Sequence, residues 1–317
     1  MKKISLGLAV CALMLLAPVL ADAQQKVNKT FSGIKRIRMG TASGSCKIQK
    51  SSDGSVKVDL QYSFDGGYEP RIEQEGERLM IKENFSGNHH NGSSTWTLSV
   101  PDGTSLNFTT GSGDLEIDGV TLELDATTGS GDMTFQNMKG DITSTTGSGN
   151  VELMNFSGEI KLNTGSGDMR VEKSSGDIDL TCGSGDIRLA DNNGSFSVNT
   201  GSGRITATNI TLAGSSRFNT GSGDARLILA ATPAYDLSVN SGSGDAELDF
   251  HGNEIKGEIV MKASKRHGRI EAPFQFDKTE EINSDWGDVT VRKSAVKGNA
   301  TNRITIGTGS GSAILKK

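Results

Sequence analysis

Hydrophobic residues recur in a short fixed pattern through the middle of the chain. Triplets in which two apolar residues flank a variable one, such as Ile160-Lys161-Leu162 and Met169-Arg170-Val171, return every nine residues. Side chains alternate between the two faces of a strand, so each triplet directs its apolar pair to one side and its middle residue to the other. The pattern predicts a series of short β-strands, each with one buried face.

Glycine separates the triplets at the same interval. Every ninth residue from Gly113 to Gly203 is glycine, with Leu122 as the exception, and every second turn follows the pattern Thr-Gly-Ser-Gly-Asp, so the full repeat is 18 residues. We expect these glycines to supply the positive φ angles of tight chain reversals, which glycine adopts at little cost. The predicted turn glycines are Gly111, Gly113, Gly129, Gly131, Gly147, Gly149, Gly165, Gly167, Gly183, Gly185, Gly201 and Gly203.

Self-similarity at a fixed period is typical of stacked repeat proteins. The sequence therefore predicts an all-β fold: a parallel β-solenoid or β-roll with 18-residue coils, each made of two nonapeptide strand–turn units. Each unit has room for a strand of about five residues and a turn of about four. If successive coils lie in registry, Ile160, Ile178 and Phe196 form one buried column.

The regular repeat occupies only part of the chain. Before and after it, strand-like alternation continues without the strict period, which predicts β-rich segments that cap the open ends of the stack. The predicted divisions are a signal peptide over 1–23, an N-terminal cap with the first coils over 24–108, the regular solenoid over 109–250, and C-terminal coils with a cap over 251–317.

The first residues indicate export. Lys2 and Lys3 precede an apolar stretch, and Ala21-Asp22-Ala23 resembles a signal-peptidase site. No second apolar stretch approaches the length needed to cross a bilayer. We therefore expect an exported chain without a transmembrane segment after this signal, located in the periplasm, at the outer-membrane surface or outside the cell.

Composition supports a thin repetitive core. Only 34% of residues are hydrophobic and 5% aromatic, and 41 are glycine. The net charge of −5, without basic clusters, argues against nucleic acid as a partner. Export permits a disulfide between Cys46 and Cys182. Because Cys182 occupies the position that threonine holds in neighbouring coils, a small half-buried thiol is the expectation.

Carboxylates follow the turn glycines, so stacking should place them in a column along one edge. We expect each to accept backbone N–H groups of its own turn. The alternative is calcium, because hard cations prefer carboxylate and carbonyl oxygens. Calcium-binding rolls of the same repeat length place the aspartate differently, whereas here it directly follows its glycine. The calcium candidates are Asp114, Asp132, Asp168, Asp186, Asp224 and Asp245; no other cofactor is expected.

An enzyme is not expected. No arrangement of Ser, His and Asp or of Cys and His recurs with supporting context. A carbohydrate-active enzyme is the remaining catalytic hypothesis, but aromatic residues are sparse and the acidic residues follow the edges of the coils.

Several features together resemble one bacterial family. They are the exported start, the strand that ends at Val100-Pro101, the Thr-Gly-Ser-Gly-Asp coils and the glycine-rich C-terminal strand. In these the chain is similar to the DUF4097 family, described as adhesin-like proteins with β-strand repeats, over most of residues 30–317. The resemblance implies a β-solenoid of the cell envelope without an established activity. Our own expectation is a non-catalytic protein whose partner is an envelope component, either protein or glycan.

Overall fold

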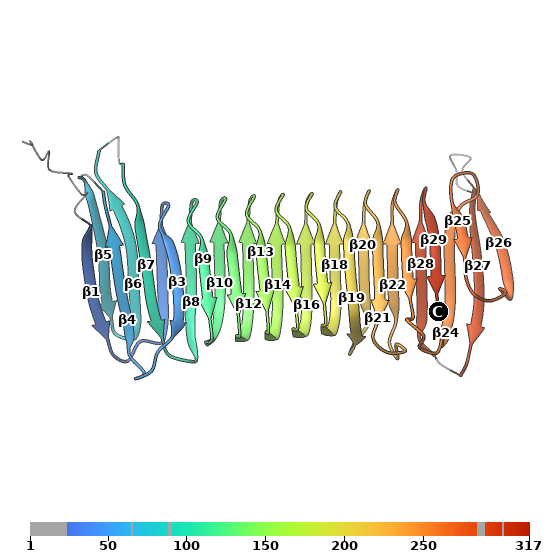
Figure 1. The fold of residues 1–317 in the computed structure, drawn as a ribbon, viewed down its shortest axis with the longest axis horizontal. Helices are drawn as coiled ribbons and strands as arrows, with labels where there is room; N and C mark the ends of the chain where they lie inside the picture. The colour runs from blue at the N-terminus through green and yellow to red at the C-terminus, as the bar shows by residue number, and fades with distance from the viewer. Residues whose placement is uncertain (1–23, 65, 88–90, 284–288, 300) are drawn as a thin grey trace, which may run out of the picture.

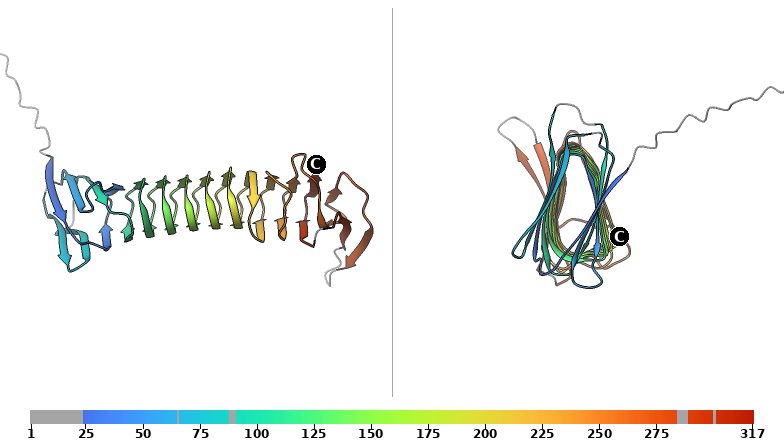
Figure 2. Two further views of the ribbon diagram at one scale, coloured as in Figure 1. Left: turned by 90° about the horizontal axis from the view of Figure 1, so that it is seen from below. Right: turned by 90° about the vertical axis from the view of Figure 1, so that its left-hand side faces the viewer.

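The computed structural model describes residues 24–64, 66–87, 91–283, 289–299 and 301–317. The strands stack side by side into an elongated rod (Figure 1), and the end-on view shows a flattened cross-section with two long faces (Figure 2). The described residues contain strands and no helix, hence no helix able to span a membrane. The all-β solenoid expected from the sequence is confirmed, whereas the predicted signal at residues 1–23 lies outside the described residues.

One long face, sheet A, is built from the following strands in spatial order: β1 (Gln25–Phe31), β4 (Val56–Tyr62), β7 (Ser94–Val100), β3 (Ser45–Lys50), β9 (Leu115–Asp118), β11 (Met133–Gln136), β13 (Val151–Met154), β15 (Met169–Glu172), β17 (Ile187–Ala190), β19 (Ile205–Leu212), β21 (Ala225–Leu229), β23 (Ala246–Asp249), β29 (Ser312–Lys316) and β25 (Arg269–Glu271).

The other face, sheet B, contains in spatial order β5 (Tyr68–Glu75), β6 (Arg78–Phe85), β2 (Arg36–Thr41), β8 (Thr104–Thr110), β10 (Thr121–Thr128), β12 (Lys139–Thr146), β14 (Ser157–Thr164), β16 (Ser175–Cys182), β18 (Asn193–Thr200), β20 (Ser216–Thr220), β22 (Leu237–Ser241), β28 (Arg303–Thr308), β24 (Gly257–Ser264), β27 (Val289–Lys297) and β26 (Lys278–Asn283).

In the central coils each strand pairs in parallel with the strand 18 residues further along. Ile160 lies opposite Ile178, and Ile178 lies opposite Phe196. The two strands of a coil are unequal: β13 on sheet A has four residues, whereas β14 on sheet B has eight. The expectation of a strand of about five residues in each unit was therefore wrong, because one corner of the coil is much tighter than the other.

The core is a narrow apolar layer between the sheets. Inward side chains such as Leu153, Leu162 and Val171 are fully buried, while the residues between them face solvent. Each aliphatic side chain so buried contributes roughly 1.5–3 kcal/mol. Because one coil holds only a few of them, stability depends on stacking neighbouring coils.

A column of small hydroxyl side chains connects each turn to the coil before it. Thr164 Oγ1 accepts a hydrogen bond from the backbone N–H of Gly167 at 3.1 Å and donates to the carbonyl oxygen of Gly149 at 3.2 Å. Cys182 occupies the next place: its Sγ accepts from Gly185 N at 2.9 Å and donates to Gly167 O at 3.4 Å. Cys182 is buried and free, as is Cys46, so no disulfide joins them.

The Cys182 position predicts a graded response to substitution. Cys182→Thr restores the hydroxyl used by the other coils and is expected to leave stability unchanged or to raise it slightly. Cys182→Ala leaves the amide of Gly185 without its partner and should cost about 1 kcal/mol. Urea unfolding of both variants measures the difference. Equal stability of the two variants would show that the side-chain hydrogen bonds contribute nothing.

Both ends of the rod are closed by antiparallel excursions. After the coil formed by β2 and β3, the chain leaves through β4 to β7 and returns on the inner side as β8, so that β2 lies between β6 and β8. At the other end β28 lies between β22 and β24, while β27 and β26 add antiparallel strands outside it. Lysine and glutamate on the outermost strand β26 oppose pairing with another sheet.

Candidate functional site

The turn glycines lie where the coils approach each other most closely. None of the glycines singled out in the sequence has a positive φ. Instead, a Cβ on Gly149 would lie within 3.0 Å of the carbonyl oxygen of Gly131 in the preceding coil, and the same holds for the other turn glycines. Positive φ falls on other glycines of the nine-residue series, such as Gly158 at 144°. The predicted positive φ is therefore wrong at the Gly-Ser-Gly turns, where close backbone stacking is the physical reason for glycine, and right at Gly140, Gly158 and Gly176.

The acidic column beside these glycines connects neighbouring coils. Asp114 Oδ1 accepts the backbone N–H of Asp132 at 2.9 Å, and Asn150 uses its amide oxygen in the same way for Asp168 N at 2.9 Å. The expectation that each aspartate closes its own turn was wrong, because the donor belongs to the next coil. In the same way, an aspartate Oδ1 accepts the backbone N–H of the residue at the equivalent position in the next coil. The pairs of acceptor and donor are Asp132 and Asn150, Asp168 and Asp186, Asp186 and Arg204, Asp224 and Asp245, and Asp245 and Ser312.

Substitutions of Asp168 test whether the acidic column binds calcium or only stabilises the stack through these hydrogen bonds. Asp168→Asn keeps an acceptor oxygen, as the natural Asn150 does, and should leave the melting temperature within about 1–2 °C of the parent. Asp168→Ala removes the acceptor and should cost about 1 kcal/mol. Melting in EDTA and in millimolar calcium gives equal midpoints if the column is structural. A calcium-dependent rise that Asp168→Asn abolishes would contradict the structural role.

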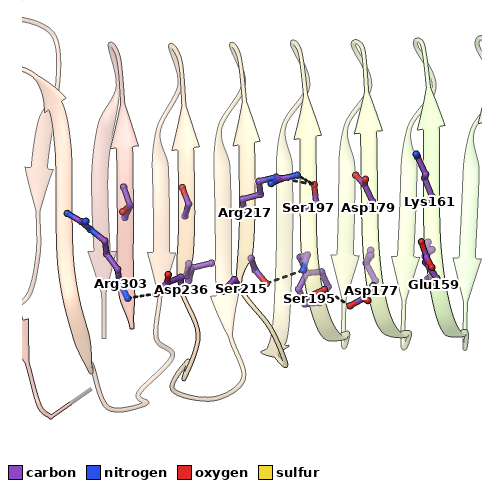
Figure 3. Close-up of a pocket in the computed structure, with 17 residues that line it drawn as sticks. Glu159, Lys161, Asp177, Asp179, Ser195, Ser197, Ser215, Arg217, Asp236 and Arg303 are labelled. Atoms are coloured by element: carbon purple, nitrogen blue, oxygen red, sulfur yellow. Dashed lines mark hydrogen bonds between the residues drawn. The ribbon is translucent and has the colours of Figure 1, made fainter. Parts of the chain in front are cut away.

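An open groove of about 490 Å³ crosses the outer face of sheet B, from β14 to β28. Two straight rows of side chains line it, with one residue of each row from every strand or from the residue just before it (Figure 3). The first row consists of Glu159, Asp177, Ser195, Ser215, Asp236 and Arg303. The second row consists of Lys161, Asp179, Ser197, Arg217, Ser238 and Thr305, which lie opposite one another in register.

The groove combines hydroxyl groups with charges of both signs. Arg217 donates from Nε and Nη2 to the hydroxyl of Ser197, at 3.1 and 2.9 Å. Within the described part of the chain, the side chains of Lys161, Asp179 and Glu159 make no hydrogen bond or ion pair. These groups therefore remain available to a ligand.

The arrangement suits binding. Neighbouring strands lie about 4.8 Å apart, so the side chains of each row are evenly spaced along the rod and do not converge on one point. In the ranges that the structure describes, no group of three or more His, Cys, Asp or Glu side chains is placed to hold a metal ion. An extended molecule lying along the rod would meet one residue of each row per strand.

Sequence reasoning missed most of this groove. It did not single out Glu159 or Asp177 as part of a binding surface, nor Arg217 and Arg303 beside them. Insertions after Leu212 and Leu229 break the 18-residue register, and β28 comes from the far end of the chain. Following outward positions only in the regular coils would have found the acidic half.

Apart from the groove, the N-terminal cap contains a buried carboxylate. Glu83 is 7% exposed, and one of its carboxylate oxygens accepts hydrogen bonds from the Trp96 indole at 3.0 Å, from the Tyr68 hydroxyl at 3.1 Å and from the Ser94 hydroxyl. The other oxygen accepts the Ala42 N–H at 2.8 Å. Burial raises the pKa of Tyr68, and the negative charge of Glu83 raises it further. Full satisfaction of a buried carboxylate fixes the positions of the cap strands around it.

The chain is similar to one protein family and to several solved structures. Residues 34–292 match the model of the Toastrack DUF4097 family. Among solved structures, a "putative lipid binding protein" from Parabacteroides distasonis is 13% identical with a TM-score of 0.37, covering 93% of this chain and 96% of its own. A "putative adhesin" from Bacteroides fragilis is 10% identical with a TM-score of 0.35, covering 93% and 97%. No curated protein matches the chain.

Proposed function

The chain belongs to the Toastrack DUF4097 family, and from the geometry of its groove we propose that it is a non-catalytic, adhesin-like interaction protein of the cell envelope. The observation that carries this proposal is the pair of straight polar rows on sheet B, which repeat at the spacing of the strands. A partner with its own repeat along one direction, such as an extended glycan, fits such a surface.

Weak contacts repeated along the rod supply the affinity. Each solvent-exposed hydrogen bond contributes only about 0.5–1.5 kcal/mol, so no single residue of the rows is sufficient. Several contacts made by one extended ligand reinforce one another because the second and later ones form within the same complex. Carboxylates, cations and hydroxyls arranged in this way favour a ligand that has both charged and hydroxyl groups.

Arg217 gives the sharpest test of the groove. Purified protein is applied to an array of extended polysaccharides and envelope glycans. Arg217→Ala should reduce binding several-fold, because a guanidinium at the centre of the second row is lost. Arg226→Ala is the matched control, since Arg226 lies on the next strand of the chain, β21, faces away on sheet A and pairs with Glu247 at 3.2 Å. Absence of binding to the array, or equal loss in both variants, contradicts the proposal.

Catalysis is tested in the same samples. Incubation with the bound polysaccharides should release no reducing ends, because the carboxylates line an open face in straight rows and the groove does not enclose one bond between two of them. Release that disappears on Asp177→Asn would identify an enzyme and overturn the non-catalytic assignment.

Export is part of the proposal and rests on Lys2, Lys3 and the apolar stretch that follows. A tagged copy should fractionate outside the cytoplasm and lack the first 23 residues when its N-terminus is sequenced. A full-length chain in the cytoplasmic fraction would contradict export while leaving the binding experiment interpretable.

A further inference from the structure

A second hollow lies on the outer face of sheet B, at the N-terminal end of the rod and separate from the groove. Its volume is about 540 Å³, and it crosses β6, β2 and β8. The register forms a small grid: Arg38 lies between Met80 and Asn107, and Gly40 lies between Lys82 and Thr109. We call this hollow the β2 slot.

Gly40 lines the β2 slot at the middle of this grid. A Cβ added to Gly40 would have no atom within 4 Å, and φ at this residue is not positive. Neither backbone conformation nor close packing therefore requires glycine here, in contrast to the turn glycines. The missing side chain leaves an opening between Lys82 and Thr109 in the otherwise continuous outer face.

Cations without partners surround the β2 slot. Arg38 and Lys82 line it, while Arg36 and Arg78 lie opposite each other on the same two strands. Their side chains make no ion pair or hydrogen bond within the described residues. Most other arginines there do have a carboxylate partner: Arg71, Arg170, Arg188, Arg204, Arg226, Arg292 and Arg303.

The nearby carboxylates are engaged elsewhere or lie at the margin. Glu73 on β5 pairs with Arg71 at 2.6 Å, and Asp125 accepts from the Asn107 amide at 3.1 Å. Glu83 borders the slot, but both of its oxygens accept hydrogen bonds inside the cap. Glu75, opposite Arg78 on β5, is the remaining acidic neighbour. The donors to Glu83 are all neutral, so its negative charge remains, but four cations on two adjacent strands still outnumber the two carboxylates Glu83 and Glu75 beside them.

We propose that the β2 slot binds a phosphate ester. The planar Arg38 guanidinium matches phosphate oxygens in pairs, and the Lys82 ammonium supplies a compact second charge. A phosphate ester carries up to two negative charges and several acceptor oxygens, which suits this excess of cations better than a single carboxylate. Met80 lies beside the charges and offers an apolar contact for the carbon part of the ligand.

The same chemistry can come from a soluble phosphate ester or from a phospholipid headgroup. Binding is therefore measured by calorimetry with glycerol phosphate, and by co-sedimentation with phosphatidylglycerol vesicles, with phosphatidylcholine vesicles as the reference. Binding in either arm supports the proposal and identifies the source. No binding to glycerol phosphate or to phosphatidylglycerol overturns it.

Two substitutions test the location of the site. Gly40→Val places an apolar side chain between Arg38 and Lys82 in the slot without changing charge, and because a Cβ meets nothing within 4 Å the fold should be retained. Affinity should fall at least tenfold. Arg38→Gln should lower affinity by about tenfold, since charge-assisted hydrogen bonds are the strong ones. Arg269→Gln is the matched control, because Arg269 also lacks a partner in the described chain but lies on β25 at the opposite end.

The outcomes distinguish specific binding at the β2 slot from non-specific electrostatic attraction. Loss in Gly40→Val and Arg38→Gln with full binding in Arg269→Gln supports the slot. Equal loss in Arg38→Gln and Arg269→Gln, or unchanged binding in Gly40→Val, overturns it. Glycan binding through Arg217 is unaffected by these variants, so this proposal and the proposed function fail independently.

Discussion

Gly149→Ala is expected to destabilise the protein by at least about 3 kcal/mol. The added methyl group would lie within 3.0 Å of the Gly131 carbonyl oxygen, which belongs to the rigid backbone of the preceding coil. The clash can be removed only if the two coils move apart, and this movement breaks the hydrogen bonds that join their turns. Overpacking of this kind typically costs 1–3 kcal/mol, and backbone atoms give way less readily than side chains. Urea unfolding with matched m-values measures the loss.

The neighbouring residue provides the control for this prediction. Ser148 lies in the same turn with an exposed side chain, so Ser148→Ala should change stability by less than about 0.5 kcal/mol. If Gly149→Ala costs less than about 1 kcal/mol, or stabilises the protein as alanine usually does where φ is not positive, then backbone crowding is not the reason for glycine in these turns.

The overall architecture follows from the sequence because two periodicities coincide. Alternation with a period of two sets the faces of each strand, and recurrence after 18 residues sets the stacking. Ile160, Ile178 and Phe196 are adjacent in the structure because a shift of one residue would turn all their side chains to solvent. Register is therefore strongly determined wherever one face of a strand is buried.

The geometry of the corners was beyond sequence reasoning. The tight corner between β13 and β14 places Asn155 at φ 55°, and equivalent corners place Asn137, Lys173 and Asp191 near the same value. Asparagine and aspartate tolerate this left-handed conformation, so they give a weak signal. Lys173 gives none. It adopts the strained conformation because the coils above and below impose it.

The candidate groove was only half visible in the sequence. The acidic side of the groove comes from regular coils, where outward positions can be counted. Arg303 reaches the same surface only because the chain returns from the C-terminal cap, and its backbone N–H donates to Asp236 at 2.7 Å. Such a contact depends on the path of the excursion, and no local pattern near Arg303 encodes that path.

That path predicts an unusual response to truncation. Ending the chain at Asn302 removes β28 and β29, which lie inside the rod although they end the sequence (Figure 1). We expect the whole C-terminal cap to lose order, because β24 then loses its partner β28. The truncation also removes the fully buried side chains of Ile304 and Ile306 on β28 from the core. Amide exchange in β24 and β27 should rise by several orders of magnitude.

Exposure of β22 and β23 adds a second expected effect of the truncation. Their unpaired backbone groups and the open core favour association between chains, so light scattering should report oligomers. Removing only the exposed Lys317 is the control and should change neither measurement. A truncated chain that stays monomeric with slow exchange in β24 would mean that the cap re-docks on β22. In that case the returning coil does not hold the end of the solenoid together.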